Sequence, residues 1–392
     1  MSNGLITDQA EFDELCAHIR ESGIVAFDTE FISESTYRPQ LCLVQLATRD
    51  RCVAADPFKL DLAEWWQIML DDEITIVTHA AREEARFCMT NTGELPRNIV
   101  DVQLAEGLRS TSYPLSYERL IGRVMGKSLN ATETRTDWQR RPLTDRQIEY
   151  ALDDVRYLLD VWDRQRKSLE NRNRLGWATE EFERLLVDMK AERSGENWVR
   201  LSGVKRLNPK QLAVARELYG WREEEADRRD SPIRRVLRDD LLIDLAKRQP
   251  QSETELLNSR DMNRSNFRRA AAGIVECVQR ALALPKSEHP PKFTREKSGN
   301  EDPVIGKLLA LSLANRCAEQ NLSAGLVGTS SDLREFVNWH NTGRNGTRPR
   351  LATGWRGEIC GDLLSDVLDG KVSVRVGDAS SDHPLVFERT SE

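Results

Sequence analysis

Histidine is scarce in this sequence, and its cysteines are few and scattered. Five histidines and seven cysteines occur among 392 residues, and no two cysteines form a CxxC pair. Zinc sites and disulfide frameworks need clustered imidazoles or thiols, so neither organises this fold. Isolated thiols are typical of a reducing compartment, and we therefore expect reduced cysteines and a cytoplasmic location.

Long apolar runs are also missing. No stretch approaches the roughly 20 apolar residues that a helix needs to cross a bilayer. The N-terminal stretch "MSNGLITDQAEFDEL" is too acidic and too weakly apolar for a signal peptide. We therefore expect no membrane partner, and a chain of this length has room for two or three domains.

Charge is distributed unevenly along the chain. Residues 1–196 carry 25 Lys and Arg against 36 Asp and Glu, whereas residues 197–286 carry 19 against 13. Residues 287–392 are nearly balanced, with 13 against 15. This segregation indicates separate domains, and it suits a metal centre beside a polyanion-binding module. Solvated helix faces of unequal sign would produce the same asymmetry.

The first 196 residues alternate between strand and helix patterns. Strand-like apolar runs occur at residues 24–30, 41–48, 51–55, 74–78 and 98–100. Helical periodicity occurs at residues 62–71, 80–91, 102–109, 116–124 and 144–172. The first three strands follow one another closely, which predicts an antiparallel meander within a mixed sheet covered by helices.

Amphipathic helices dominate from residue 207 onward. Two polar stretches, "RSGEN" (193–197) and "PKSEHPPKFTREKSGNED" (285–302), are typical of linkers. We expect domains over residues 1–196, 197–286 and 303–392, with a linker at 287–302. The final stretch, "GDASSDHPLVFERTSE", is expected to be a loose tail.

Two carboxylates interrupt an apolar strand at "IVAFDTEF", residues 24–31. Asp28 and Glu30 directly follow the apolar run, and side chains two positions apart on a strand point to the same face. Each carboxylate raises the cost of ionising the other. The pair therefore predicts a nearby cation.

Two further acidic blocks lie downstream. In "THAAREEARF" (78–87), Glu83 and Glu84 open a helix just after an apolar strand. In "EYALDDVRYLLD" (149–160), Tyr150 and Asp154 are four residues apart and share a helix face. The latter helix begins with a Thr-x-x-Gln capping box at residues 144–147.

Carboxylates without histidine or cysteine company are hard oxygen ligands suited to Mg²⁺ or Mn²⁺. Two such ions, about 3.5–4 Å apart, activate a water and stabilise a leaving oxygen in phosphodiester hydrolysis. Taken singly, each acid is more simply a helix cap or a surface residue. In combination, the acids predict a site for two divalent metal ions.

These blocks resemble the three motifs of the tyrosine-type DEDD exonucleases: "FDTEF", "THAAREEARF" and "YALDDV". The stretches "STYRPQLCLVQLA" (35–47) and "TETRTDWQRRPLTDRQIEYALDDVRYLL" (132–159) are closely similar to the ribonuclease D family, and the resemblance covers residues 5–190. Residues 207–250 resemble an HRDC domain, and residues 351–377 resemble the weaker second HRDC repeat of that family.

The resemblance implies an RNase H-like α/β fold, a mixed sheet flanked by helices, followed by two all-α HRDC-type domains. It implies 3′→5′ hydrolysis of RNA ends to nucleoside 5′-monophosphates, including the trimming of tRNA 3′ ends. By position, Asp28, Glu30 and Asp154 match metal-binding acids, and Tyr150 matches the tyrosine that orients the attacking water. The fourth acid, an aspartate in the family, falls on Glu84.

Substrate contacts are predicted at several aromatic and basic residues. Phe31, beside the acids, suits a terminal nucleotide but equally suits core packing. Arg140 and Arg141 precede the capped helix as candidate phosphate contacts, with a solvated loop as the alternative, and Trp138 is expected to anchor that loop. The stretch "RRDSPIRRVLR" (228–238) holds five arginines. Its candidate phosphate contacts are Arg228, Arg229, Arg234 and Arg235.

Three functions remain open from the residues. The first is an active exoribonuclease that uses two Mg²⁺ or Mn²⁺ ions and acts as a monomer on RNA. The second is a non-catalytic RNA-binding protein on a decayed nuclease site, suggested by Glu84 and by Ala131, where the family has lysine. The third is a DNA 3′–5′ exonuclease. Three unchanged acids and Tyr150 favour catalysis, whereas no residue decides between RNA and DNA.

Overall fold

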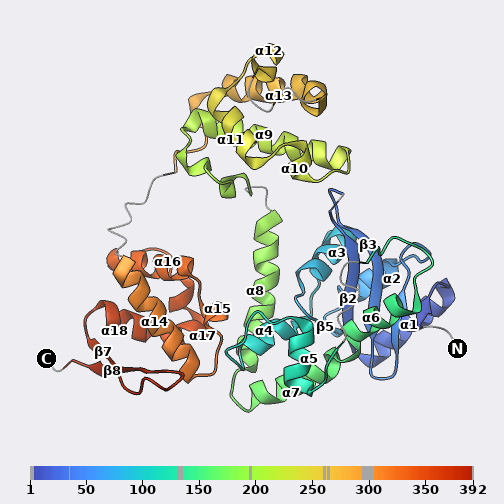
Figure 1. Cartoon of the computed structure of the whole chain (residues 1–392), viewed down its shortest axis with the longest axis vertical. Helices are drawn as coiled ribbons and strands as arrows, with labels where there is room; N and C mark the ends of the chain where they lie inside the picture. The colour runs from blue at the N-terminus through green and yellow to red at the C-terminus, as the bar shows by residue number, and fades with distance from the viewer. Residues whose placement is uncertain are drawn as a thin grey trace. The chain divides into compact units, whose positions relative to one another are not determined.

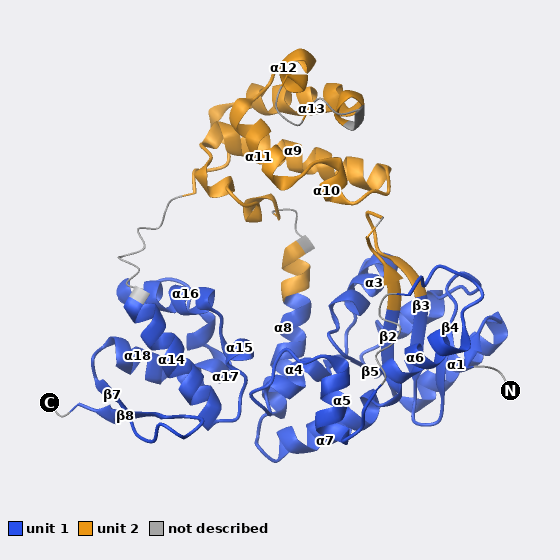
Figure 2. Cartoon of the chain, viewed as in Figure 1, with its two compact units in different colours: residues 1–29, 43–187, 296–392 blue, residues 30–42, 188–295 orange. Residues whose placement is uncertain are grey.

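The structure is a computed structural model that describes residues 4–34, 36–129, 136–193, 197–258, 262, 265–293 and 303–390. Ala131 and most of the two predicted linkers, at residues 194–196 and 294–302, lie outside the described residues. The chain divides into two compact units (Figure 2): unit 1 comprises residues 1–29, 43–187 and 296–392, and unit 2 residues 30–42 and 188–295. Unit 1 therefore joins segments that the sequence assigned to separate domains.

Six strands form one mixed sheet at the N-terminal end of the chain (Figure 1). They are β1 (Leu5–Ile6), β2 (Ile24–Ile32), β3 (Gln40–Ala47), β4 (Cys52–Ala55), β5 (Thr75–Thr78) and β6 (Ile99–Asp101), in the order β1-β4-β3-β2-β5-β6. As the short connection predicts, β3 pairs antiparallel with β4. In contrast, β2 pairs parallel with β5, and β5 with β6.

Eight helices precede residue 194 in the described part of the chain. They are α1 (Gln9–Ser22), α2 (Ala63–Ile68), α3 (Arg82–Thr92), α4 (Val102–Gly107), α5 (Tyr117–Met125), α6 (Asp145–Arg156), α7 (Leu158–Glu170) and α8 (Leu175–Arg193). The predicted helix over 144–172 is two helices, divided at Tyr157, and its capping box is confirmed. The sequence analysis missed α1, although Asp8 caps it and Gly23, with φ 65°, ends it.

Different helices cover the two faces of the sheet. Phe27 packs against Trp65 of α2, with ring centroids 4.8 Å apart. Its neighbour Ala26 belongs instead to the core cluster that contains Val155 of α6. Because side chains alternate along a strand, Asp28 points to the same face as Ala26. The first acid of "FDTEF" therefore lies on the α6 side of the sheet.

The C-terminal segment adds helices and a hairpin to unit 1. Its elements are α14 (Pro303–Glu319), α15 (Ala324–Val327), α16 (Ser330–Asn341), η4 (Arg350–Ala352), α17 (Gly354–Arg356), the π-helical η5 (Gly357–Gly361), α18 (Asp362–Leu368), β7 (Val372–Val376) and β8 (Leu385–Arg389). The predicted loose tail is wrong for β8, which pairs antiparallel with β7. The Asn315 side chain also holds the backbone of Leu385 at both N–H and C=O.

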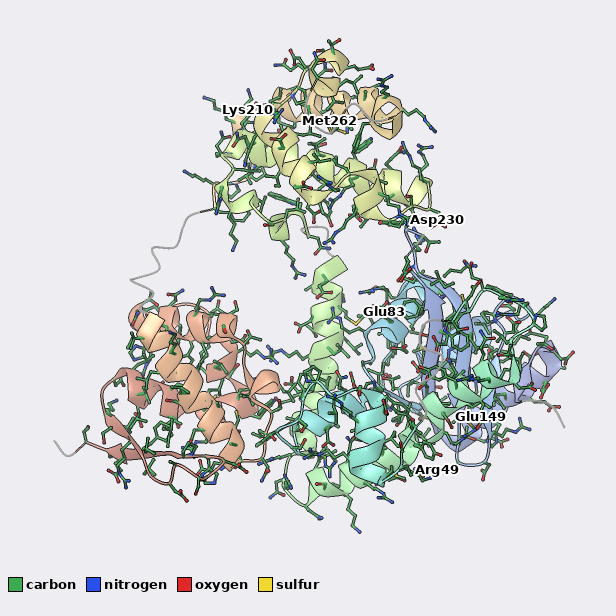
Figure 3. All side chains as sticks on the ribbon, viewed as in Figure 1. Arg49, Glu83, Glu149, Lys210, Asp230 and Met262 are labelled. Carbon is green, nitrogen blue, oxygen red and sulfur yellow. The ribbon has the colours of Figure 1, made fainter. Side chains whose placement is uncertain are left out.

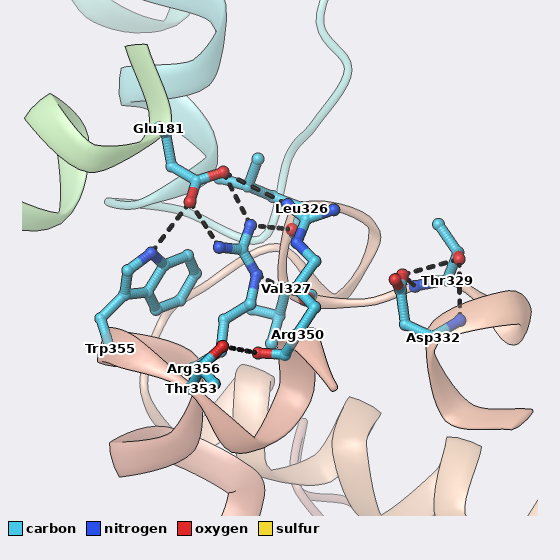
Figure 4. A network of polar contacts seen from close by, with 9 residues as sticks. All are labelled: Glu181, Leu326, Val327, Thr329, Asp332, Arg350, Thr353, Trp355 and Arg356. Atoms are coloured by element: carbon cyan, nitrogen blue, oxygen red, sulfur yellow. Dashed lines mark hydrogen bonds and ion pairs between the residues drawn. The ribbon is translucent and has the colours of Figure 1, made fainter. Parts of the chain in front are cut away.

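A buried polar network ties this segment to α8 (Figure 4). Arg356 donates to both carboxylate oxygens of Glu181, one of them at 2.7 Å, and Trp355 Nε1 donates to the same carboxylate at 3.0 Å. Arg350 lies 3.3 Å from it. The indole of Trp355 also stacks on Trp177 of α8, with centroids 5.2 Å apart. The C-terminal helices and the nuclease helices thus share one core.

Unit 2 is built mainly of helices. They are η1 (Asn197–Arg200), η2 (Val204–Arg206), α9 (Pro209–Arg228), α10 (Ile233–Val236), α11 (Asp239–Arg248), α12 (Glu253–Leu257), α13 (Ser265–Ala283) and η3 (Lys286–Glu288). Asn208 and Gln211 form a capping box at the start of α9, and Pro209 occupies its first turn. No helix among the described residues of either unit is long and apolar enough to cross a membrane.

Candidate active site

Strand β2 delivers the first predicted acid to the edge of the core. Val25 to Phe27 are fully buried, Asp28 is half-buried, and Thr29 is 6% exposed. Glu30 and Phe31 follow in the same strand and are half-buried. The apolar start of β2 anchors the strand, so that the position of Asp28 is set by the core.

Glu84 joins Asp28 from the first turn of α3. Its side chain is 4% exposed and accepts a hydrogen bond from Thr29 Oγ1 at 3.0 Å. Burial raises the pKa of Asp28 to about 7, while hydrogen bonds from the Thr29 backbone and the Glu84 side chain act in the opposite direction. Burial, followed by the negative charge of Asp28, raises the pKa of Glu84 well above its usual value. The two carboxyl groups therefore form one coupled pair.

Glu83 and Glu84 have different surroundings, although they are adjacent in the sequence. The Glu83 carboxylate accepts from Arg86 Nη1 at 2.7 Å, and its side chain is 33% exposed. Neighbours on a helix point about 100° apart, so only one of the two reaches the sheet. The structure turns Glu84, and not Glu83, toward Asp28.

Asp101, which the sequence analysis missed, fixes the turn before α3. Its two carboxylate oxygens accept from the backbone N–H groups of Ala80 and Ala81, each at 3.1 Å. The same carboxylate caps α4 by accepting from Gln103 N at 2.8 Å. Ala80 has a left-handed φ of 62°, and the hydrogen bonds to Asp101 hold it in this conformation. An aspartate after the apolar run of β6 was a detectable helix-cap signal.

Helix α6 brings Tyr150 and Asp154 to the same side of the sheet. Both are half-buried, and the Tyr150 ring lies 6.2 Å from that of Trp138, centroid to centroid. Burial, together with the negative charges of Asp154 and Asp28, raises the pKa of Tyr117 well above its usual value. Asp28 and Asp154 therefore lie close enough to act on one phenol.

A second polar layer supports this arrangement from α5. The Tyr117 hydroxyl donates to the Asp153 carbonyl at 2.9 Å, and its ring packs edge-on against His79, with centroids 5.6 Å apart. His79 Nε2 lies 2.9 Å from the Leu115 carbonyl. Burial lowers the pKa of His79, although the charge of Asp101 and the hydrogen bond to Leu115 oppose this shift. His79 therefore connects the "THAAR" turn to α5 and the loop before it.

The predicted substrate arginines of unit 1 differ in their contacts. Arg141 pairs with the buried Asp56 through two hydrogen bonds of 2.8 Å, and its guanidinium lies 4.5 Å from the Phe58 ring centroid. Arg141 also donates to the carbonyl of Trp138, which is 4% exposed. Arg141 and Trp138 thus anchor their loop, as predicted for Trp138, whereas Arg140 is exposed.

The predicted basic surface of unit 2 is partly neutralised. Arg228 and Arg229 both pair with Glu225, the former at 2.7 Å. Arg234 and Arg235 are exposed at the start of α10. Arg228 and Arg229 are exposed as well, but in the described part of the chain no acid pairs with Arg234 or Arg235, which are therefore better placed to meet a polyanion.

The donor set matches the chemistry of a hard cation. Asp28 pairs with Glu84, and the charges of Asp28 and Asp154 both act on Tyr117, so carboxylate oxygens gather here. Within the described ranges, no group of three or more His, Cys, Asp or Glu side chains lies close enough to hold a metal ion together. Buried carboxylates without thiol or imidazole partners fit Mg²⁺ or Mn²⁺.

Comparisons with known proteins agree with this geometry. A family model described as a 3′–5′ exonuclease matches residues 4–170, and an HRDC domain model matches residues 211–278. Ribonuclease D of Bartonella henselae is 31% identical over 373 residues, which cover 94% of this chain and 90% of that protein. Ribonuclease D of Nitrobacter hamburgensis is 33% identical over 380 residues, covering 95% and 97%.

A solved structure extends the likeness to three dimensions. The crystal structure of Escherichia coli RNase D matches with a TM-score of 0.83 and 28% identity, over 94% of this chain and 99% of that one. The predicted α/β exonuclease domain followed by a helical HRDC domain is confirmed, and the C-terminal region is rich in helices but also contains the β7–β8 hairpin. The chain belongs to the ribonuclease D family and is a 3′–5′ exoribonuclease.

Proposed function

We propose that the chain removes nucleotides from RNA 3′ ends as nucleoside 5′-monophosphates with the help of two divalent metal ions. The observation that carries this proposal is the pair of the half-buried Asp28 and the buried Glu84, on the face of the sheet that α6 covers with Asp154. Together with Glu30, these acids would hold Mg²⁺ or Mn²⁺. When bound, the ions supply Lewis acidity for the attack of water and the departure of the ribose oxygen.

The remaining residues position the attacking water and the metal-binding side chains. Tyr150 orients the attacking water through its phenol hydroxyl, which can donate and accept a hydrogen bond. Trp138 supports the Tyr150 ring from the side. Thr29 and the hydrogen bonds to Asp101 keep Glu84 against Asp28, so that the longer glutamate arm starts from a fixed backbone.

The substrate is proposed to be RNA with a single-stranded 3′ end, including tRNA precursors. Escherichia coli RNase D is described as an exoribonuclease involved in structured RNA processing. In this chain, Phe31 would contact the terminal nucleotide, and Arg140 the phosphates near it. Arg234 and Arg235 would bind the RNA backbone, with weaker help from Arg228 and Arg229, and the protein would act as a cytoplasmic monomer.

Digestion of matched RNA and DNA strands tests this function. The strands carry a label at the 5′ or the 3′ end and are incubated with Mg²⁺, Mn²⁺ or EDTA. We expect a 5′-labelled RNA to shorten in steps, with nucleoside 5′-monophosphates as the product and no reaction in EDTA. Faster digestion of DNA would establish the DNA exonuclease, and no digestion with either metal would establish the RNA-binding alternative.

Glu84 gives a sharper test of the metal site. Mg²⁺ demands near-ideal octahedral geometry at about 2.0–2.1 Å, so a longer carboxylate arm penalises it more than Mn²⁺. We expect higher activity in Mn²⁺, a smaller difference in Glu84→Asp, and no activity in Glu84→Gln. Glu83→Gln is the matched control and retains activity. Loss of activity in Glu83→Gln alone would shift the assignment by one residue.

A further inference from the structure

Strand β3 carries a glutamine whose side chain lacks partners. Gln45 is 0% exposed, and neither its Oε1 nor its Nε2 has a hydrogen-bond partner in the part of the chain that the structure describes. Leaving a buried polar atom unsatisfied is unfavourable, because the atom has lost its hydrogen bonds to water. An apolar residue at this position would avoid that cost on both atoms. The polar side chain of Gln45 is therefore expected to have a function that an apolar side chain cannot perform.

The register of the sheet places Gln45 under α6. Gln45 pairs with Ala54 of β4, and two residues on, Ala47 pairs with Cys52. Side chains that are paired across antiparallel strands point to the same face, as do residues two apart in one strand. The Cys52 thiol lies 3.7 Å from the Leu152 carbonyl of α6. Gln45 therefore points to the face that α6 covers.

Asp28 lies on that same face, in the neighbouring strand β2. Residues 33–39 connect β2 to β3, a link too short for a parallel crossover. Counting back equally from Ile32 and forward from Gln40 brings Gln45 level with Phe27, which lies on the other face of the sheet. Paired residues of antiparallel strands share a face, so Gln45 is opposite a residue next to Phe27, either Ala26 or Asp28. Opposed residues have Cβ atoms about 4.5–5.5 Å apart and diagonal neighbours about 7–8 Å, so a long side chain at Gln45 can approach Asp28 in both cases.

The residues around Gln45 are small. Its cross-strand partner Ala54 and its same-face neighbour Ala47 both end at Cβ, as does Ala26 in the cluster below Asp28. The Gln45 amide can therefore extend over these alanines. Ordered water in a polar, enclosed site makes about three hydrogen bonds to otherwise unsatisfied groups.

We propose that Gln45 is a positioning residue for the metal site: its amide holds ordered water against the Asp28 carboxylate and fixes the orientation of that carboxylate. The inference rests on the proposed role of Asp28 as a metal ligand. Partners that orient a metal ligand typically contribute 10–100-fold to metal affinity or activity. A purely structural glutamine would contribute to folding alone.

Calorimetric titration of the full-length chain with Mn²⁺, without RNA, tests this role. Gln45→Met keeps the length of the side chain and removes both polar atoms. We expect about 10–100-fold weaker Mn²⁺ binding by the folded variant, with its folded state checked by urea unfolding. Unchanged Mn²⁺ affinity in Gln45→Met would overturn the inference.

Two further variants guard against a general loss of packing. Trp65→Phe removes another fully buried, unpartnered donor, Trp65 Nε1, from the opposite face of the sheet. We expect Trp65→Phe to keep wild-type Mn²⁺ affinity, and an equal loss of affinity there would overturn the role of Gln45. If Gln45→Met does not fold, Gln45→Asn shortens the arm but keeps the amide, and its unchanged affinity would also overturn the inference. Absence of Mn²⁺ binding by the wild type would refute the proposed function instead.

Discussion

Breaking the ion pair of Glu181 and Arg356 tests whether the C-terminal helices are an integral part of unit 1. The two side chains are 4% and 2% exposed. Arg356 also donates to the carbonyls of Val327, at 2.8 Å, and Leu326, at 2.9 Å. Removing one partner of a buried pair leaves an uncompensated charge and costs about 3–5 kcal/mol. We expect a loss of stability near the lower end of this range for Glu181→Gln and near the upper end for Arg356→Met. The latter variant also leaves two carbonyls without their hydrogen-bond donor.

The pair also predicts a pH dependence. Burial by itself would raise the pKa of Glu181, but hydrogen bonds and charge from Arg356, with help from Trp355 and Arg350, hold the pKa below its usual value of 4.5. A carboxyl group with a depressed pKa in the folded state stabilises the protein above its unfolded pKa. Its contribution is lost as pH falls through the folded pKa. The gap between wild type and Glu181→Gln should therefore be full at pH 7 and shrink below pH 4.5.

Urea unfolding of the full-length variants measures these losses. The exposed pair of Arg316 and Glu319 on α14, 2.7 Å apart, is the control, and its Glu319→Gln variant should lose at most about 1 kcal/mol. The double variant Glu181→Gln with Arg356→Met should lose less than the two single losses added, since one broken pair is counted once. The view that this ion pair is buried would be refuted if each single variant lost as little stability as the control. It would also be refuted if the losses of the two single variants simply added in the double variant.

Three further outcomes follow from the site and the basic surface. Asp28→Asn should abolish nuclease activity and leave the chain in EDTA at least as resistant to urea as wild type, because a buried charge is removed; full activity would contradict its metal role. Tyr150→Phe should lower turnover while calorimetry shows unchanged Mn²⁺ affinity, and a collapsed affinity would reassign the tyrosine. Replacing both Arg234 and Arg235 by glutamine should reduce the slope of log K against log[salt] for single-stranded RNA by roughly 0.7 per lost contact. An unchanged slope would show that these arginines do not touch the backbone.

Several features followed from short stretches of sequence because their causes are local. The apolar runs of β2 to β6 predicted the strands, and the Thr144 capping box predicted the start of α6. The helix break at Tyr157 was missed, because residues on both sides keep helical periodicity. Strand β8 was missed for another reason: its backbone is held by Asn315, which lies 70 positions away.

The acids themselves were evident from the sequence, but their partners were not. "FDTEF" placed Asp28 at the end of a strand, whereas only the fold showed that Thr29 holds Glu84 beside it. Arg141 looked like a phosphate contact, and the structure shows it paired with Asp56, 85 positions away. Local patterns report which side chains a segment presents, but they carry no information about what those side chains meet.

The sequence by itself determined strands β2 to β6, most helices of the nuclease segment and the family, because propensity, periodicity and residue chemistry act over a few neighbouring positions. Tertiary structure alone decided that Asp101 braces the turn before Glu84, that Gln45 is sealed beneath α6, and that Arg356 neutralises Glu181. These contacts join residues far apart in the chain. Their free energy depends on burial, which exists only after the sheet and helices have packed.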